Sequence, residues 1–402
     1  MSRTAPAQHR RSVRGPRPWL RAVALVAVAV PLFAASAAYA VYRHLDGNID
    51  TATGVDDYLG DTRPTHAAAA PLTDGYAGRE VNILVMGIDS RDGSNKEYGY
   101  VDGARSDSTF LVHLPADRSR IDVVSVPRDS LVDIPACKLP DGSMTRPRTM
   151  EMFNAAFEIG GGPTQDLTSA AACTRKTFEQ DTGVRTDEHV VLKMNGVRDV
   201  IDDLGGVPFC FPEAMDSDKA KLHVKAGRTV LDGRTSVEFL RARTGEGGGL
   251  WLGSDLARLD RQHAFLEALT AKVHASQLLT HPTTLLQVLD SATKAVSVSP
   301  GLGSIRSMAG LAVTAKGLGG DDIVSVTVPT ASYRGTGRVV WTSAADDLWL
   351  RLREDRPLVG DAKPHATTTP TGSSSPQAST KPTKPTKPHV PTTWPSSAEC
   401  GT

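Results

Sequence analysis

Arginine and aspartate side chains stand close together at three places where apolar runs of strand length begin or end. These pairs are Asp89 and Arg91, Arg105 and Asp107, and Arg128 and Asp129. The arginine guanidinium binds phosphate through two parallel hydrogen bonds and stays charged. Two neighbouring carboxylates can hold Mg²⁺, which completes its coordination shell with water and phosphate oxygens. The residue types therefore predict a site for phosphate or pyrophosphate with Mg²⁺ beside it.

A second set of polar residues lies further along the chain. Arg241 and Arg243 end a predicted helix over 232–243, and Arg258, Arg261 and Gln262 form one face of a predicted helix over 255–276. Each group has a structural alternative that the sequence leaves open. Arg128 and Asp129 can form a local ion pair, the arginines at 241 and 243 can complement a helix dipole, and the face at 258–262 can be solvated.

No common catalytic motif competes with this interpretation. The sequence lacks GxSxG, HExxH, GxxxxGK[ST] and GxGxxG, which leaves serine hydrolases, zinc proteases, P-loop enzymes and dinucleotide-binding folds without support. Arginines, carboxylates and Mg²⁺ together suit phosphoryl transfer, in which catalysis consists mostly of positioning and charge neutralisation.

The elements that position these residues follow from the spacing of apolar side chains. Residues 81–87, 109–114 and 121–126 are predicted strands, and an up-down-up order brings the three Arg/Asp pairs to one sheet edge. Helices are predicted over 165–180, 194–204, 281–294 and 303–317, followed by a strand over 323–328. Strands that alternate with helices indicate an α/β fold.

Length and charge limit the class of protein. The chain has 402 residues, of which 40% are hydrophobic, and 45 basic residues balance 45 acidic ones. Residues 44–360 nevertheless carry a net charge of −9, because 34 basic side chains stand against 43 acidic ones. An acidic central domain argues against a nucleic-acid binder.

The N-terminal segment predicts a membrane anchor. Residues 22–42 are uncharged and long enough to cross a bilayer, and six arginines precede them. This bias predicts a single-pass protein of the cell membrane with a cytoplasmic N-terminus and an extracytoplasmic domain. A cleaved signal peptide ending near Ala38–Ala40 is the alternative. We divide the chain into a basic segment 1–21, a transmembrane helix 22–42, a linker 43–78, a catalytic domain 79–358 and a disordered Pro/Thr/Lys-rich tail 359–402.

Four cysteines suit an oxidising compartment. Cys137, Cys173, Cys210 and Cys400 lack the spacing of a zinc site and permit three disulfide pairings. We favour Cys137–Cys173, with a free, buried Cys210 as an open alternative.

The segments that carry the Arg/Asp pairs and the later arginines resemble the LytR-CpsA-Psr family of the actinobacterial type. The resemblance covers about residues 79–275 and rests on the ordered segments LVMGID at 84–89, RSD at 105–107, SVPRD at 125–129, FNAA at 153–156, LGGV at 204–207, Arg241-x-Arg243 and DLARLDRQ at 255–262. It implies a three-layer α-β-α domain with a central mixed sheet. It also implies a Mg²⁺-dependent phosphotransferase that moves a glycopolymer from a polyprenyl-pyrophosphate carrier onto a peptidoglycan hydroxyl. A hydrophobic pocket would hold the prenyl chain.

The resemblance assigns roles to single residues. Asp89 and Asp107 correspond to the Mg²⁺ ligands, and Arg128 and Asp129 are the catalytic candidates. The pyrophosphate would bind Arg91, Arg105, Arg128, Arg241, Arg243, Arg258, Arg261 and Gln262. Met152 stands where relatives often carry Lys. This departure keeps open a non-catalytic protein that binds the lipid, and a pyrophosphatase is a further alternative. The partners expected are a lipid-linked glycan, peptidoglycan and the cell membrane, with no nucleic acid.

Overall fold

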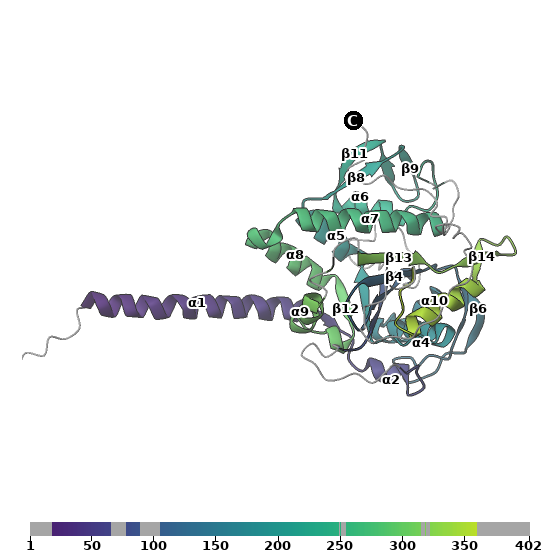
Figure 1. The fold of residues 1–402 in the computed structure, drawn as a ribbon, viewed down its shortest axis with the longest axis horizontal. Helices are drawn as coiled ribbons and strands as arrows, with labels where there is room; N and C mark the ends of the chain where they lie inside the picture. Colours follow the sequence, from purple (N-terminus) through teal and green to yellow (C-terminus); the bar gives the residue numbers. More distant parts are fainter. Residues whose placement is uncertain are drawn as a thin grey trace, which may run out of the picture. The chain divides into compact units, whose positions relative to one another are not determined.

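The computed structural model describes residues 18–65, 78–88, 105–248, 250, 255–314, 318 and 322–359. Asp89 and Arg91, which the sequence places in the site, lie outside the described residues, as does the tail from residue 360. The chain forms two compact units, Met1–Gly47 and Asn48–Thr402 (Figure 1). The second unit carries all of the described site residues.

The described part of the first unit is one long apolar helix. Helix α1 spans Pro18–Asn48 and contains Pro31, and its segment Leu25–Asn48 has a mean hydropathy of 1.9 over an 18-residue window. Its large apolar side chains from Val23 to Tyr42 are exposed, as Phe33 shows with 77% of its surface accessible, whereas Leu45 near its C-terminal end is buried. By length and composition this helix can cross a bilayer, and it contains the predicted segment 22–42.

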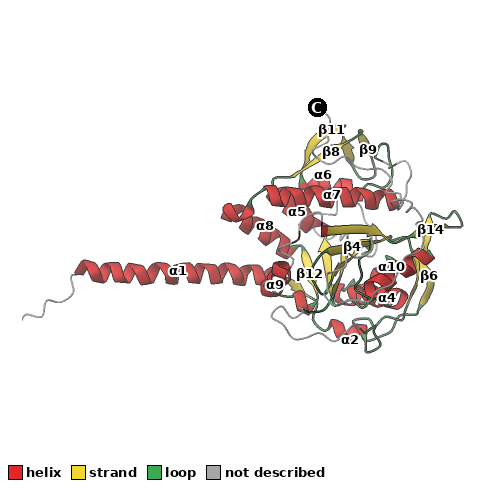
Figure 2. Cartoon of the chain, viewed as in Figure 1, coloured by secondary structure: helices red, strands yellow, loops and turns green. Residues whose placement is uncertain are grey.

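A seven-stranded mixed sheet forms the centre of the second unit (Figure 2). Its order is β1 (Asp50–Thr51), β12 (Val296–Val298), β7 (Glu188–Lys193), β2 (Val81–Ile88), β3 (Ser106–Leu114), β4 (Ile121–Val126) and β13 (Ile323–Thr327). The β2–β3 and β3–β4 pairs are antiparallel, whereas β2–β7 and β4–β13 are parallel. The up-down-up order and the central mixed sheet predicted from the sequence are therefore confirmed.

The period of two along β2 divides its side chains between two cores. Leu84 and Met86 pack with Phe153 and Phe178 in one cluster, on the side of α3 (Ala155–Gly161), α4 (Leu167–Thr182) and α10 (Ser343–Arg353). Val81 and Ile83 point to the opposite face and pack near Leu302 and α9 (Ile305–Thr314). A strand whose two faces are both apolar needs helices on both sides, which produces the three predicted layers.

A lobe that the sequence analysis does not predict stands beside the sheet (Figure 1). Strands β8 (Val207–Phe211) and β11 (Gly227–Leu231) pair in it, as do β9 (Met215–Ser217) and β10 (Leu222–Val224). Phe209, Phe211, Phe239 and Phe265 form its core, with ring centroids of Phe209 and Phe239 5.0 Å apart. The helices in and around this lobe are α5 (Met194–Asp203), α6 (Gly233–Arg241), α7 (Asp255–Ala275) and α8 (Pro282–Lys294).

Short elements complete the second unit. Strands β5 (Leu131–Ile134) and β6 (Arg148–Met152) form one antiparallel pair, and β14 (Thr330–Tyr333) and β15 (Arg338–Trp341) form another. Within the described residues, single-turn helices lie at η2 (Gly162–Thr164), η4 (Leu278–Thr280) and η5 (Pro300–Leu302). Residues 50–65, which the sequence analysis assigns to a linker, belong to the folded unit. Strand β1 pairs with β12, and α2 (Val55–Leu59) buries Val55 and Leu59.

The favoured disulfide is present. Cys137 and Cys173 are bonded, with their Cα atoms 5.5 Å apart, and the bond ties the loop after β5 to helix α4. Cys210 is also disulfide-bonded, so the alternative of a free thiol at this position is wrong. Cross-links of this kind stabilise the fold by restricting the unfolded chain.

Candidate functional site

Asp107 is the centre of the site. Its Oδ1 accepts a hydrogen bond from Arg128 Nη1 at 2.8 Å and lies 2.9 Å from Arg243 Nη2. Asp107 is at the start of β3, Arg128 follows β4 and Arg243 follows α6. The antiparallel register pairs Thr109 with Val126, so the beginning of β3 and the end of β4 meet at one sheet edge. The predicted convergence of these segments is confirmed for Asp107 and Arg128.

The arginines keep the Asp107 carboxyl ionised. Burial alone raises its pKa, but the positive charges of Arg243, Arg128 and Arg258 lower it more, and the resulting pKa lies below the ordinary value of 3.8. A hydrogen bond from Arg128 acts in the same direction. The site is thus an anion held among several cations, with positive charge left over for a phosphate group.

Helix α7 closes the site with two buried polar side chains. Arg258 donates from Nη2 to the main-chain oxygen of Asp107 at 2.5 Å, and Gln262 donates from Nε2 to Ser108 Oγ at 2.8 Å. Only 2% of Arg258 and 5% of Gln262 is exposed. The alternative of a solvated helix face is therefore wrong, since these residues dock α7 against the start of β3.

An apolar cavity opens beside these polar groups. Its volume is about 660 Å³, within the usual range for small-molecule sites. Asp107, Arg241, Arg243, Arg258 and Gln262 line its polar part. The rest is mainly apolar and comes from α5, α6, α7, α8 and the adjoining strands, with Leu192, Met194, Val197, Val200, Ile201, Leu240, Phe265, Leu266, Leu269, Ala292, Ala295 and Val296. A single cavity therefore offers an apolar wall and a cluster of arginines.

Four predicted residues, Arg105, Arg128, Asp129 and Arg261, are not part of the cavity lining. Arg261 is 1% exposed and donates to the carbonyls of Gly248 and Ala242, at 2.9 and 2.6 Å, so it braces the segment after α6 and does not line the cavity. Arg105 forms an ion pair with Glu158 of α3 at 2.5 Å and does not line the cavity. Asp129 lies 3.5 Å from Arg128 Nε, so the local ion pair exists alongside the contact from Arg128 to Asp107.

Asp107 fits the donor set of a Mg²⁺ site. Its carboxylate is ionised, and the contacts from Arg128 and Arg243 both go to Oδ1, so Oδ2 is the atom that would bind a cation. Mg²⁺ prefers such oxygen ligands and is usually held by one or two carboxylates together with substrate phosphates. The second predicted ligand, Asp89, directly follows β2, whose residue Ile88 pairs with Ser106.

Residues that the sequence analysis did not single out also build the site. Ser108 and Phe110 line the cavity from β3, where the period of two places them on the same face as each other. His263 lies next to Gln262 and forms a hydrogen bond of 2.6 Å to Ser125 Oγ, which joins α7 to β4. The strand alternation contained a signal for Ser108 and Phe110, whereas the His263 contact depends on tertiary packing.

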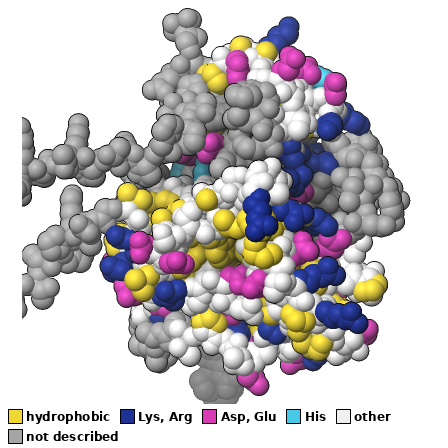
Figure 3. Space-filling view, turned by 90° about the vertical axis from the view of Figure 1, so that its right-hand side faces the viewer, with side chains coloured by type: hydrophobic (Ala, Val, Ile, Leu, Met, Phe, Trp, Pro, Cys, Tyr) yellow, Lys and Arg dark blue, Asp and Glu magenta, His cyan; other side chains and the backbone are white. Residues whose placement is uncertain are grey.

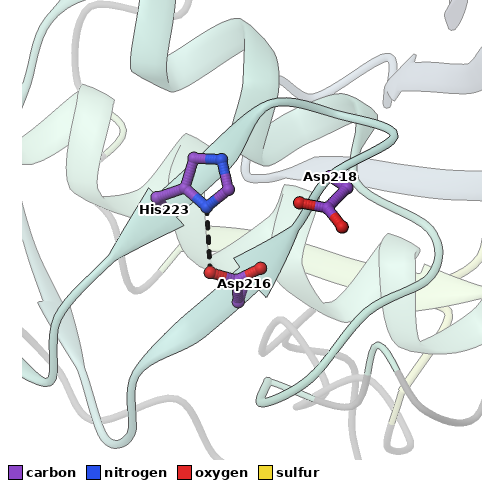
Figure 4. Close-up of side chains that lie close together, drawn as sticks. All are labelled: Asp216, Asp218 and His223. Carbon is purple, nitrogen blue, oxygen red and sulfur yellow. Dashed lines mark hydrogen bonds and ion pairs between the residues drawn. The ribbon is translucent and has the colours of Figure 1, made fainter.

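A separate cluster of metal-ligating side chains lies on the β9–β10 hairpin (Figure 4). Asp216, Asp218 and His223 bring their ligand atoms within 4.8 Å of one another, and all three residues are exposed. His223 Nδ1 lies 2.9 Å from Asp216 Oδ2, and this hydrogen bond raises the pKa of His223. The hydrogen bond accounts for the proximity of His223 and Asp216, and exposed acidic groups of this kind need no metal ion.

The central mixed sheet and the apolar cavity with its arginines define a class of protein, and comparison with known sequences agrees. The sequence model of the LytR_cpsA_psr family matches residues 49–353, and the chain belongs to this family. The resemblance stated from the motifs is thereby confirmed.

Individual relatives are moderately similar. A probable cell wall biosynthesis protein, LcpB of Corynebacterium glutamicum, is 29% identical over 304 residues, which cover 73% of this chain and 66% of the relative. A polyisoprenyl-teichoic acid–peptidoglycan teichoic acid transferase, TagU of Oceanobacillus iheyensis, is 26% identical over 295 residues, which cover 72% of this chain and 79% of the relative. The alignment with LcpB thus spans slightly less than two thirds of that protein.

Solved structures share the fold. A structure titled TagT bound to LIIa-WTA has a TM-score of 0.51 at 20% identity and covers 76% of this chain and 98% of its own. A LytR-Csp2A-Psr enzyme from Actinomyces oris has a TM-score of 0.50 at 19% identity, covering 73% and 96%. These similarities confirm the α/β architecture with its central mixed sheet.

Proposed function

We propose that this protein is a membrane-anchored transferase that moves a glycopolymer from a polyprenyl-pyrophosphate carrier onto a hydroxyl of peptidoglycan. The observation that carries the proposal is the cavity of about 660 Å³, whose wall is apolar and whose polar part holds three arginines. A prenyl chain needs the apolar wall, and the pyrophosphate needs the arginines. The named relatives support a cell-wall transferase.

The reaction is an attack on phosphorus. The oxygen of the acceptor hydroxyl forms a bond to the phosphorus that carries the glycan, and the bond from this phosphorus to the bridging oxygen breaks. Polyprenyl phosphate leaves with the electron pair, and the product is a phosphodiester between the glycan and the acceptor. Arg243, Arg258 and Arg128 neutralise the negative charge that grows on the leaving phosphate.

The proton of the hydroxyl needs a base. Asp129 is the candidate because it follows Arg128 directly and its side chain is 20% exposed. Asp107 is less suited, since two arginines contact its Oδ1 and lower its pKa. Mg²⁺ bound at Asp107 and Asp89 would neutralise part of the charge on the pyrophosphate oxygens.

The proposed location follows from the N-terminal helix. Six arginines stand before residue 22, and the segment Leu25–Asn48 is apolar enough to span a membrane. The excess of positive charge on the N-terminal side supports a cytoplasmic position for that end and, with it, an extracytoplasmic position for the second unit. A prenyl carrier and peptidoglycan are both present on that side of the membrane.

The test is transfer by the full chain in detergent or liposomes. A polyprenyl-pyrophosphate glycan labelled in its sugar is incubated with soluble peptidoglycan oligosaccharides and Mg²⁺. The proposal predicts a labelled phosphodiester product and free polyprenyl phosphate in equal amounts. Lipid binding without release of polyprenyl phosphate would identify a binding protein, and release without labelled peptidoglycan would identify a pyrophosphatase.

A further inference from the structure

The hairpin of β14 and β15 is hydrogen-bonded to Asp129 and Ser130, the two residues that follow Arg128. Val339 of β15 donates its main-chain N–H to the carbonyl of Asp129 at 3.2 Å, and Trp341 donates from Nε1 to Ser130 Oγ at 3.0 Å. Val339 also forms a parallel bridge with Ser130. These contacts fix the hairpin next to Asp129.

Strand alternation decides which side chains of the hairpin face solvent. The Trp341 ring centroid lies 5.2 Å from that of Trp349, so this side chain points into the core. Arg338 is an odd number of positions from Trp341 and therefore points the opposite way. Tyr333 is the register partner of Arg338 on β14, which places the two side chains next to each other on the outer face.

The outer face of the hairpin is aromatic and basic. Arg334 and Arg338 are exposed, and the guanidinium carbon of Arg334 lies 5.0 Å from the Tyr333 ring centroid. Residues 330–341 contain these two arginines and no acidic residue, within a domain whose net charge is −9 over 44–360. Figure 3 faces the side of the molecule that carries β14 in Figure 1 and shows Lys and Arg side chains gathered there.

We propose that the outer face of the β14–β15 hairpin, formed by the half-buried Tyr333 and the exposed Arg334 and Arg338, binds the acceptor, a glycan strand whose peptides carry carboxylates. The inference rests on the proposed function. The donor lipid occupies the cavity beside Asp107, so the acceptor must reach the phosphorus from another side, and the hairpin adjoins Asp129, the candidate base. Tyrosine rings stack on sugar rings, and exposed arginines attract carboxylates that the acidic remainder of the domain repels.

The test separates acceptor affinity from donor affinity. The variant Arg334→Ala/Arg338→Ala is compared with wild type and with Arg306→Ala, a control that removes another exposed arginine on α9. Exposed ion pairs are weak, so we expect the KM for the acceptor to rise about threefold to tenfold. The kcat and the KM for the donor stay unchanged, as does the melting temperature. Higher salt should reduce the difference.

A second arm addresses the carboxylates and does not need transfer. Binding of purified soluble peptidoglycan fragments to the full chain is measured for wild type and Arg338→Glu, once with native fragments and once with fragments whose carboxylates have been amidated. We expect the charge reversal to weaken binding of the native fragments and to leave the amidated ones unaffected.

The outcomes distinguish this inference from the proposed function. Equal binding of native fragments by wild type and variant, or an unchanged acceptor KM, overturns the role of the hairpin. A rise in donor KM alone also overturns it and assigns the hairpin to the glycan of the donor. Wild type can fail to transfer the glycan and still bind peptidoglycan fragments in a way that depends on Arg338. That result would contradict the proposed function and support the hairpin as a binding face.

Discussion

Arg128 Nη1 and Asp107 Oδ1, 2.8 Å apart, join the end of β4 to the start of β3. Arg243 Nη2 reaches the same oxygen from the segment after α6. The carboxylate therefore orients two guanidiniums that come from distant parts of the chain, and it does so next to the apolar cavity. This arrangement makes the effects of single substitutions specific enough to test.

Arg128→Lys keeps the charge but loses the planar fork that binds phosphate through two hydrogen bonds. Charge-assisted hydrogen bonds contribute about 1.5–3 kcal/mol each, so we expect transfer to fall about tenfold to hundredfold. Arg128→Ala should lose more. The measurement is kcat/KM with labelled lipid-linked glycan. Equal activity of wild type and Arg128→Lys would show that Arg128 is only structural.

Asp107→Asn removes the charge that the arginines share. The pKa of Asp107 is lowered on folding, so its carboxylate stabilises the fold above about pH 4 and loses this effect as the pH falls through the folded-state pKa. Because the side chain is 31% exposed, we expect a loss of at most about 1 kcal/mol at pH 7. Transfer and its response to Mg²⁺ should be lost. Asp347→Asn, at an exposed position of α10, is the control for stability.

Ala292→Phe fills part of the cavity from helix α8. A methylene group that cannot enter an apolar site loses about 0.8 kcal/mol of binding free energy. If the Phe side chain excludes two methylene groups of the prenyl chain, binding weakens about tenfold. Mass spectrometry of the lipid that co-purifies with the detergent-solubilised protein measures the effect. Ala292→Ser adds almost no volume and should retain the lipid. Full occupancy in the Phe variant would contradict the assignment of the cavity to the carrier.

Asp181→Asn tests a half-buried carboxyl away from the site. Burial raises the pKa of Asp181 to about 7, and the nearby Asp133 adds to the effect. The folded protein therefore holds a proton that the unfolded chain releases near pH 4, and stability falls as the pH rises from about 4 to 7. We expect Asp181→Asn to raise the melting temperature at pH 8 by roughly 2–4 °C, and by less at pH 5.

Asp141→Asn gives a comparison of opposite sign. Hydrogen bonds from the Ser143 side chain and backbone lower the pKa of the exposed Asp141 carboxyl, so its ionised form stabilises the fold above about pH 4. This variant should be slightly less stable at pH 8 than wild type. If Asp181→Asn changed the melting temperature equally at pH 5 and pH 8, the pKa of the Asp181 carboxyl would not be raised.

Membrane topology can be tested with a reporter that is active only outside the cytoplasm. Fusion after residue 78 should give activity, and fusion before Ala22 should give none. Replacement of the six arginines before Ala22 should reduce the activity of the first fusion, because the positive charges hold that end in the cytoplasm. Activity only from the fusion before Ala22 would invert the proposed orientation.

The sequence by itself determined the local elements and the family. Short apolar runs of strand length predicted β2, β3 and β4, and the short polar turn after β3 led to their up-down-up order, because both are local properties of the chain. From that order alone Asp107 and Arg128 were expected at one edge, and they are in contact. The ordered motifs predicted the family that the comparison confirmed.

Tertiary structure decided which predicted residues share the site. Arg258 and Arg261 are one turn apart on α7, yet the first contacts Asp107 and lines the cavity while the second is buried against the carbonyls of Ala242 and Gly248. The lobe around Phe209 and the contact of Val339 with Asp129 were likewise absent from the prediction. Helical spacing fixes the direction of a side chain only relative to its own helix. The partner that it meets depends on packing between segments far apart in the chain, which no local pattern encodes.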